Sequence, residues 1–233
     1  MLTQRTILVT GATGGLGRVA VSAAAESGAR LILVGRDEAS LSELAGEHPE
    51  AVASTHRADL RDTAAVSHLA SATAAEVDAI WHLVGGWRGG SRLPDQPLDD
   101  WGWLHDQLVR TTVHMARTFG DTLAARPAGR FAIVSSPLAL APTSDNAAYS
   151  SAKAGAEAAV LALADHFRGT PATANIVVVP AIRTSAVGIA EPAREASRAV
   201  PAADIGAALV YLTSDAAGKM NGQRIRLHAG GPS

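Results

Sequence analysis

The sequence predicts a doubly wound α/β fold, with about seven parallel strands and helices on both faces of the sheet. Short apolar runs alternate with helical periodicity along the chain. Strands that are joined through helices need crossover connections, which makes the sheet parallel. Runs such as Ile7–Val9, Leu31–Val34 and Ile176–Val179 are continuously apolar, as strands covered on both faces must be. A glycine-rich turn after the first of these runs completes the pattern.

The elements follow one another in regular alternation. The β-branched run at 6–10 is ended by glycines, which makes it the first strand, and a helical pattern at 19–26 leads to a second strand at 31–34. The same reasoning predicts strands at 51–57, 79–84, 130–135, 174–179 and 223–228. The helices between and after them are expected at 39–46, 63–75, 98–125, 147–168 and 203–214.

No linker or internal repeat interrupts this alternation, so a single domain over residues 1–233 is expected. Two irregular stretches, 85–97 and 181–201, follow the carboxyl ends of strands. Open α/β sheets bind ligands at that edge. We therefore expect the second stretch, about 181–201, to be the substrate loop, and its shortness and few aromatics predict an open site.

Composition narrows the class of partner. The chain is 47% hydrophobic and 18% charged, which suits a large core. Its net charge is −2, from 20 Lys and Arg against 22 Asp and Glu, and no long run of like charge occurs. This pattern indicates no nucleic-acid or anionic-lipid surface and favours a small-molecule partner.

The chain has no cysteine, which excludes disulfides, thiolate catalysis and Cys-based zinc sites. No apolar segment of signal-peptide length precedes the first glycines. The alanine-rich stretch 147–164 is interrupted by Lys153 and Glu157, short of the roughly 20 apolar residues that a membrane span needs. A cytoplasmic protein with no membrane segment is expected.

The turn Thr10-Gly11-Ala12-Thr13-Gly14-Gly15-Leu16-Gly17 lies between the first strand and the first helix. Glycines there let the backbone turn tightly and approach a pyrophosphate at the helix N-terminus, where free amides and the helix dipole meet the anion. The general pattern G-x-G-x-x-G/A is met by Gly15, Gly17 and Ala20. An ordinary strand-to-helix turn also accepts glycines, so both interpretations stay open for this segment alone.

Arg36 ends the second predicted strand, where a dinucleotide-binding unit meets the adenosine ribose. An acidic residue there would bind the 2′-hydroxyl of NAD. Gly35 instead leaves room, and Arg36 can pair with a 2′-phosphate. We therefore predict a preference for NADP(H). Asp37 is a rival acidic candidate, so NAD(H) and a merely solvated Arg36 remain the alternatives.

Tyr149 and Lys153 are four residues apart on a predicted helix, which places the phenol and the ammonium on one face. A nearby cation lowers the pKa of a phenol from roughly 10 toward neutrality, so Tyr149 could act as acid or base on a carbonyl or alcohol. Ser136, at the end of the preceding strand, could hold the same oxygen. By itself the Tyr-x-x-x-Lys pair is as well explained by a structural role.

Together these motifs resemble the short-chain dehydrogenase/reductase family over essentially the whole chain. The family's T-G-x-x-x-G-x-G is matched by Thr10, Gly11, Gly15 and Gly17, and its serine, tyrosine and lysine by Ser136, Tyr149 and Lys153. Asp59-Leu60 resembles the pair that contacts adenine, residues 180–184 resemble the P-G-x-x-x-T segment against the nicotinamide, and Gly222-Gln223 resembles the motif opening the last strand.

The resemblance implies a Rossmann-type sheet and the roles of individual residues. Lys153 would also bind the nicotinamide ribose, while Ile182 and Thr184 would hold the carboxamide. The implied cofactor-binding set is Gly11, Thr13, Gly15, Leu16, Gly17, Arg36, Asp59, Leu60, Gly85, Tyr149, Lys153, Ile182 and Thr184. The family's pairing of long helices further implies a homodimer or homotetramer.

Two positions depart from the family pattern. Where the family reads N-N-A-G, this chain has His82-Leu83-Val84-Gly85. Leu108 stands at the position of the family's fourth catalytic residue, an asparagine that holds a water of the proton relay. Gln107 and His105 are neighbours that could substitute, although one helical step turns a side chain by about 100°. Catalysis is therefore expected to be slower, relayed differently or absent.

Histidines and tryptophans receive mostly structural interpretations. His48, His56, His68, His166 and His228 show no metal-binding spacing and are interpreted as surface residues. Four tryptophans are interpreted as core or interface packing, and one of them is the best candidate to face substrate: Trp81, Trp87, Trp101 and Trp103, with Trp87 as that candidate.

Two functions from different classes follow. The leading hypothesis is an NADP(H)-dependent oxidoreductase that interconverts a carbonyl and an alcohol, with Ser136, Tyr149 and Lys153 as catalytic residues. The second is a dinucleotide-binding sensor or scaffold without turnover, which Leu108 and the 82–84 segment support. An epimerase or isomerase is disfavoured because the chain offers little room for a nucleotide-sugar domain. The substrate itself is not identified by the sequence.

Overall fold

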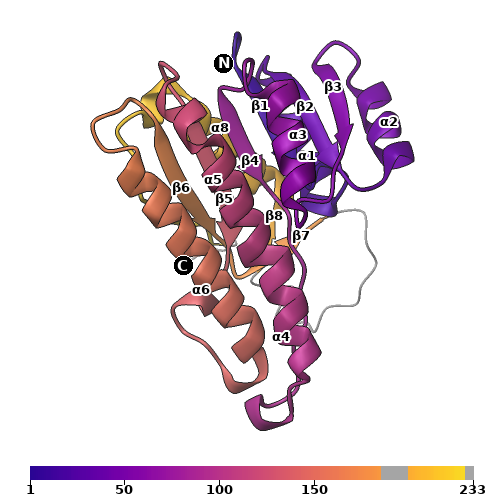
Figure 1. The fold of residues 1–233 in the computed structure, drawn as a ribbon, viewed down its shortest axis with the longest axis vertical. Coiled ribbons are helices and arrows are strands. Elements are labelled where there is room, and N and C mark those ends of the chain that lie inside the picture. Colours follow the sequence, from indigo (N-terminus) through magenta and orange to yellow (C-terminus); the bar gives the residue numbers. More distant parts are fainter. Residues whose placement is uncertain (185–198, 229–233) are drawn as a thin grey trace.

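A computed structural model describes residues 1–184 and 199–228 of the chain. Seven parallel strands form one sheet in the order β3-β2-β1-β4-β5-β6-β9, and helices cover it on both sides (Figure 1). The strands are β1 (Thr6–Thr10), β2 (Arg30–Gly35), β3 (Val52–Arg57), β4 (Ala79–His82), β5 (Arg130–Ser135), β6 (Thr173–Val178) and β9 (Arg224–Arg226). The predicted doubly wound fold is confirmed.

The helices divide between the two faces of the sheet. One face is covered by α3 (Thr63–Thr73), α5 (Thr111–Ala124) and α6 (Ala147–His166). The other is covered by α1 (Gly15–Glu26), α2 (Glu38–Glu47) and α8 (Ala202–Thr213). In β1 the fully buried Leu8 belongs to the first core, and its neighbours Ile7 and Val9 belong to the second. Apolar residues are needed at every position of such a strand because both of its faces are buried.

The strand order reverses direction at β1, which lies between β2 and β4. The connections that follow β1 and β4 therefore run over opposite faces of the sheet, through α1 and α5. A crevice outside the carboxyl ends of the strands is expected at such a switch point. Every candidate site described below borders this edge.

The helix predicted at 98–125 is in fact three segments. It begins as α4 (Leu98–Leu104), widens into a π-helical stretch over His105–Arg110, and continues as α5. The hydroxyls of Thr111 and Thr112 donate to the carbonyl oxygens of Gln107 and Leu108, at 2.6 and 2.7 Å. These side-chain bonds help to satisfy carbonyls at the point where the helix widens. An unbroken α-helix was the wrong expectation here.

The expected substrate loop at 181–201 also contains regular structure. Its ends, β7 (Ala181–Arg183) and β8 (Ala199–Pro201), pair in parallel as a separate two-stranded sheet. Residues 185–198, the middle of that loop, lie outside the described residues. The other predicted boundaries differ from the structure by a few residues, as at β4, which ends at His82 rather than at 84.

Candidate active site

The phosphate turn between β1 and α1 is shaped by glycine. Gly11 has a φ of +69°, and a Cβ there would lie 2.8 Å from the carbonyl oxygen of Leu83. A Cβ at Gly17 would collide with the carbonyl oxygens of Gly11 and Ala12. Within the described chain no side chain caps α1 at Gly14. The first amides of α1 are therefore left for an anion.

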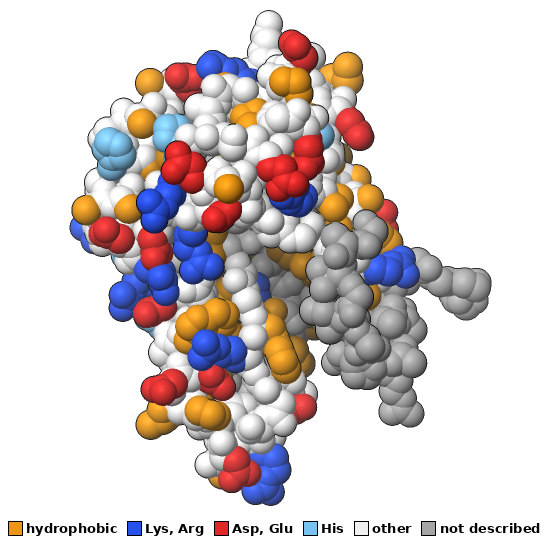
Figure 2. Space-filling view, turned by 90° about the vertical axis from the view of Figure 1, so that its right-hand side faces the viewer, with side chains coloured by type: hydrophobic (Ala, Val, Ile, Leu, Met, Phe, Trp, Pro, Cys, Tyr) orange, Lys and Arg blue, Asp and Glu red, His pale blue; other side chains and the backbone are white. Residues whose placement is uncertain are grey.

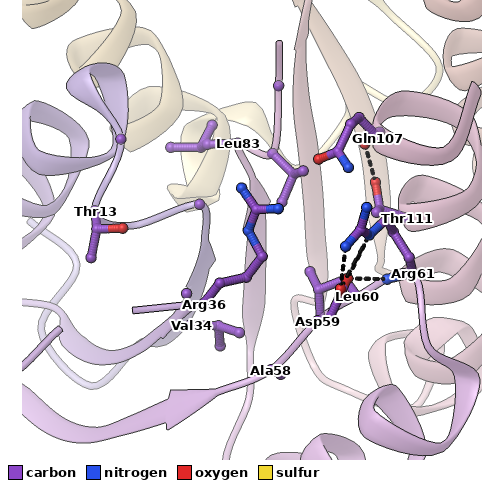
Figure 3. Close-up of a pocket in the computed structure, with 15 residues that line it drawn as sticks. Thr13, Val34, Arg36, Ala58, Asp59, Leu60, Arg61, Leu83, Gln107 and Thr111 are labelled. Atoms are coloured by element: carbon purple, nitrogen blue, oxygen red, sulfur yellow. Dashed lines mark hydrogen bonds and ion pairs between the residues drawn. The ribbon is translucent and has the colours of Figure 1, made fainter. Parts of the chain in front are cut away.

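A cavity of about 240 Å³ opens beside this turn. Figure 3 shows it between the turn, the end of β2, the segment after β3, the segment after β4 and the π-helical stretch. Six residues that the sequence predicted for cofactor binding line it, namely Gly11, Thr13, Arg36, Asp59, Leu60 and Gly85. The cavity is also lined by Gly14, Val34, Gly35, Ala58, Arg61, Leu83, Val84, Gln107 and Thr111.

Arg36 and Asp37 are positioned differently at the end of β2. Arg36 lines the cavity, and its side chain lies across the centre of Figure 3. Asp37 is the N-cap of α2 and accepts a hydrogen bond from the amide of Ser40 at 2.7 Å. Hydrogen bonding from the side chain of Ser40, and then from its amide, lowers the pKa of the Asp37 carboxyl. The rival acidic candidate is thus already engaged in capping a helix.

Asp59 is held by its neighbour Arg61, which the sequence analysis had not singled out. Arg61 donates to both carboxylate oxygens, with Nε at 2.9 and 3.1 Å and Nη2 at 2.6 Å, and its amide adds a fourth bond at 3.0 Å. These bonds lower the pKa of Asp59 to about 2. The acceptor sites of this carboxylate are therefore largely occupied within the protein.

Tyr149 and Lys153 share one face of α6, as predicted. Lys153 is 8% exposed, its Nζ lies 5.7 Å from the centroid of the Tyr149 ring, and it donates to the carbonyl oxygen of Val134 at 2.9 Å. Burial lowers the pKa of Lys153 to about 8, against the opposing effect of the Glu157 carboxylate. Burial raises the pKa of Tyr149 to about 12.

The expected lowering of the Tyr149 pKa is therefore wrong for the free protein. The ammonium of Lys153 is directed to a backbone carbonyl, and desolvation of the phenol dominates. Ser136 is buried at the end of β5, and its Oγ accepts from the amide of Leu138 at 3.3 Å. The turn at Pro137–Ala139 packs against α6, which places Ser136 close to the same helix.

The residues expected around the nicotinamide lie outside this cavity. Thr184 adjoins the phosphate turn, because a Cβ on Gly15 would lie 3.2 Å from its Cγ2. Ile182 is half-buried in β7 against the second core, and the side chain of Leu16 packs on that same core. Leu16 therefore offers only its backbone to a ligand at the turn. The cofactor contacts of Leu16, Ile182 and Thr184 remain predictions.

Leu108, at the position of the family asparagine, is buried in an apolar cluster. It is 2% exposed and shares the cluster with Leu104, Ala148 and Ala152, with Tyr149 packed alongside. His105 points outward, with a side chain that is 60% exposed. Gln107 instead lines the cavity. Of the two neighbours considered as substitutes, the π-helical stretch directs only Gln107 inward.

His82 replaces the first asparagine of the family pattern as a buried bridge. Its Nδ1 lies 2.8 Å from the hydroxyl of Thr10, and its Nε2 lies 3.1 Å from that of Thr111. Burial lowers the pKa of His82 to about 3, so the ring is neutral at pH 7. The hydroxyl of Thr111 donates its hydrogen to the carbonyl of Gln107, so it can only accept from His82. The neutral ring therefore carries its proton on Nε2, and Nδ1 accepts from the hydroxyl of Thr10.

The tryptophans separate into core and surface. Trp81 is fully buried and donates to the hydroxyl of Thr213 at 2.8 Å, and Trp101 and Trp103 pack on the Leu108 cluster. Trp87 is 59% exposed and donates to Asn146 at 3.2 Å. Packing is confirmed for the first three, and a substrate-facing role for Trp87 stays a prediction.

The histidines interpreted as surface residues fall into two groups. Three of them, His68, His166 and His228, are exposed, whereas His48 and His56 are half-buried, each against a serine hydroxyl at 3.1 Å. In the described ranges 1–184 and 199–228, no cluster of three His, Asp or Glu residues could hold a metal. Figure 2 shows acidic and basic side chains interspersed over the face it presents.

Sequence reasoning missed Arg61 and Thr111 as site residues and mentioned Gln107 only as a substitute for the asparagine. Arg61 directly follows the recognised pair Asp59-Leu60, which is a signal that could have found it. Thr111 carried no such signal, since its role depends on the position of His82 in a neighbouring strand.

Fold and site together define a dinucleotide-binding α/β protein. The family model for short chain dehydrogenases matches residues 5–195. An uncharacterized oxidoreductase of Bacillus subtilis, YvaG, is 30% identical over 190 residues, which cover 80% of this chain and 71% of that protein. An uncharacterized oxidoreductase of Mycobacterium tuberculosis is 29% identical over 247 aligned positions, covering 97% of this chain and 91% of its own.

A solved short-chain dehydrogenase/reductase from Mycobacterium ulcerans has the same fold, with a TM-score of 0.88 at 22% identity over 97% of this chain and 88% of that one. The chain belongs to the short chain dehydrogenase family, and it is an NAD(P)-dependent dehydrogenase/reductase. None of the helices in the described part of the chain is long and apolar enough to cross a membrane.

Proposed function

We propose that this protein interconverts a carbonyl and an alcohol on a small-molecule substrate, with NADP(H) as its preferred cofactor. The observation that carries the proposal is the pairing of the buried Lys153 with the half-buried Tyr149 on one face of α6. A lysine is rarely buried without a partner or a function. Beside a phenol and near Ser136, it forms the acid–base group that a carbonyl reaction requires.

The residues present fit a dinucleotide. The turn excludes any Cβ at Gly11 and Gly17, and the amides at the start of α1 have no side-chain cap within the described chain. Both features suit a pyrophosphate. Thr184 lies against Gly15, where it could join the turn to the nicotinamide end. When bound, the nicotinamide supplies or accepts the hydride.

The chain's own groups would handle the proton. Tyr149, with its pKa raised to about 12, is protonated at neutral pH and can donate to the substrate oxygen during reduction. Lys153, with a pKa of about 8, is mainly charged at pH 7 and can stabilise the phenolate that forms. Ser136 would hold the substrate oxygen in place by a hydrogen bond.

Arg36 supports the preference for NADP(H). It lines the cavity, and Asp37 is engaged at the cap of α2. A guanidinium can pair with a 2′-phosphate by charge-assisted hydrogen bonds. NAD(H) remains the alternative cofactor.

The second candidate is a dinucleotide-binding sensor without turnover. It is favoured by Leu108, which puts an apolar side chain where the family has a relay asparagine, and by the bond of Lys153 to a backbone carbonyl. The two functions differ in one measurable property, the loss of turnover when a single phenolic oxygen is removed.

Tyr149→Phe tests the proposal against the sensor. We expect reduction of a panel of ketones, aldehydes and quinones to fall by about 10²–10⁴-fold, because the proton donor is lost. NADPH affinity, followed by fluorescence, should stay nearly unchanged. Equal inactivity of the wild type and Tyr149→Phe across the panel, despite tight NADPH binding, would favour the sensor.

We further propose a cytoplasmic homodimer or homotetramer that pairs through α5 and α6. A hollow of about 400 Å³ lies between these helices, lined by small and apolar residues such as Ala116, Gly120 and Ala159. Val113, which lines the hollow, is 40% exposed, and Leu161 on α6 is 39% exposed. A monomer mass by light scattering at micromolar concentration would argue against the pairing.

A further inference from the structure

The side chain of Gln107 is buried in the wall of the cavity, and its amide nitrogen has no partner there among the described residues. Gln107 is 5% exposed, and its Nε2 has no hydrogen-bond partner within the described part of the chain. Figure 3 shows the side chain directed into the cavity, above Arg61 and across from Thr13. A buried amide of this kind costs free energy unless something pairs with it. Nearly all such groups in folded proteins have a partner, so a ligand is a direct explanation.

The position of Gln107 indicates which part of a ligand it meets. The same cavity is lined by Arg36 and by the segment Asp59-Leu60-Arg61, whereas Ser136, Tyr149, Lys153 and Thr184 do not line it. The cavity therefore corresponds to the adenosine half of a dinucleotide rather than to the half that reacts. Gln107 therefore lies at the adenosine end of the site, whereas Tyr149 and Lys153 do not line this cavity.

Because Asp59 is already bound by Arg61, an adenine in this cavity would need another polar partner. Arg61 occupies both oxygens of that carboxylate. An adenine presents a donor next to an acceptor along its edge, and a carboxamide offers the complementary pair, as glutamine does when it reads adenine in nucleic acids. Among the described residues that line the cavity, Gln107 alone carries a carboxamide.

A buried network holds the backbone of Gln107 in place. Its carbonyl accepts from Thr111 at 2.6 Å, Thr111 accepts from His82 at 3.1 Å, and His82 accepts from Thr10 in β1 at 2.8 Å. This series of bonds ties the π-helical stretch to two central strands. The backbone of Gln107 is thereby held in place before any ligand arrives, which reduces the entropy that this segment loses on binding.

We propose that Gln107 is a cofactor-binding residue that pairs its carboxamide with the adenine of the dinucleotide. The inference rests on the proposed function, since it assumes that NADP(H) occupies this cavity. It assigns to Gln107 a binding role in place of the relay role of the missing asparagine.

Calorimetric titration with adenosine 2′,5′-bisphosphate and with NADPH tests the assignment on the purified full chain. Gln107→Met keeps length and volume but removes the amide, and we expect it to weaken both ligands about tenfold. The matched control is Gln223→Met, an exposed glutamine outside the cavity, which should leave both affinities unchanged. Gln107→Asn, a shorter amide, should fall between the wild type and Gln107→Met.

The free protein provides an independent readout. Because the amide of Gln107 is unpaired without ligand, Gln107→Met should unfold at the same or a higher urea concentration than the wild type, while its stabilisation by adenosine 2′,5′-bisphosphate decreases. A purely structural role would instead lower the stability of the free protein and would overturn the proposal.

Two other results would also overturn it. The first is an unchanged affinity for adenosine 2′,5′-bisphosphate in both Gln107 variants, with a shifted pH profile of turnover, because that places Gln107 in the proton relay. The second is a wild-type protein that binds neither ligand, which removes the proposed function together with this inference. If the wild type binds both ligands and the Gln107 variants bind them equally well, only this inference fails. The two failures are therefore distinguishable.

Discussion

The phosphate turn between β1 and α1 is shaped by backbone atoms, whereas the corner that holds Tyr149 and Lys153 is shaped by packed side chains, of which Lys153 is buried and Tyr149 half-buried. In the turn, Gly11 and Gly17 exclude any Cβ by contact with carbonyl oxygens. In the corner, burial moves the pKa of Tyr149 up and that of Lys153 down. The first region is thus shaped by steric contacts that do not change with pH or ligand. The chemistry of the second depends on desolvation, which a bound cofactor would alter.

The comparison explains why the two regions differ in how readily they tolerate departures from the family. The turn retains every glycine of its motif, and a Cβ at Gly11 or Gly17 would collide with a backbone carbonyl. Around the corner, Leu108 and His82 replace asparagines, and the surrounding structure accommodates them by apolar packing and by a hydrogen-bonded bridge. Side-chain networks can be rebuilt with other residues, whereas a backbone approach cannot.

The largest effect is expected in the turn. Gly17→Ala would place a methyl group against the carbonyls of Gly11 and Ala12, and we expect it to destabilise the protein by about 3 kcal/mol and to remove most NADPH affinity. Urea unfolding and a fluorescence titration measure both. The control is Gly46→Ala in α2, where a Cβ meets nothing within 4 Å.

Gly46→Ala should stabilise the protein by about 0.5–1 kcal/mol, because alanine is the better helix former. If the two alanine variants behaved alike, the turn would not be sterically determined, and the contrast drawn with the catalytic corner would be lost.

The next effect concerns the pH dependence of the side-chain network. His82 binds a proton near pH 6.5 when unfolded but only near pH 3 in the folded protein. Between these values the unfolded chain binds more protons, so stability is retained above pH 6.5 and is lost as the pH falls toward 3. The difference in proton binding at His82 alone should lower the free energy of unfolding by about 2–3 kcal/mol between pH 7 and pH 4.5.

Comparison of urea unfolding at pH 7 and pH 4.5 for the wild type and His82→Gln checks this. The variant should lose less stability on acidification, whatever its stability at pH 7. The control is His68→Gln, at an exposed histidine of α3. It should lose as much stability between pH 7 and pH 4.5 as the wild type does. A slope that is identical in all three proteins would contradict the burial of a neutral His82.

The smallest effect is expected at the rim of the cavity, where Arg36 is exposed to solvent. Arg36→Ala should weaken NADPH binding by about 1–3 kcal/mol, because a charge-assisted bond to the 2′-phosphate is lost. NADH binding should change little. Titration of both cofactors with both proteins is the measurement, and equal affinities before and after the change would remove the NADP(H) assignment.

The sequence by itself determined the order of strands and helices, the seven-stranded parallel sheet and the glycine turn. These features depend on local spacing and on which residues are apolar, and both can be read without coordinates. It also placed Tyr149 and Lys153 on one helix face, because four residues make about one turn. The family of the protein followed from the same motifs.

Only the tertiary structure decided how the polar groups of the site are paired. The opposite pKa shift of Tyr149, the bond of Lys153 to Val134 and the capture of Asp59 by Arg61 depend on burial and on contacts that spacing does not predict. The π-helical stretch that directs Gln107 into the cavity is stabilised through His82, 25 residues earlier in the chain and in a different element. Such long-range hydrogen bonds form only when the sheet is assembled, and they determine which neighbour of Leu108 reaches the site.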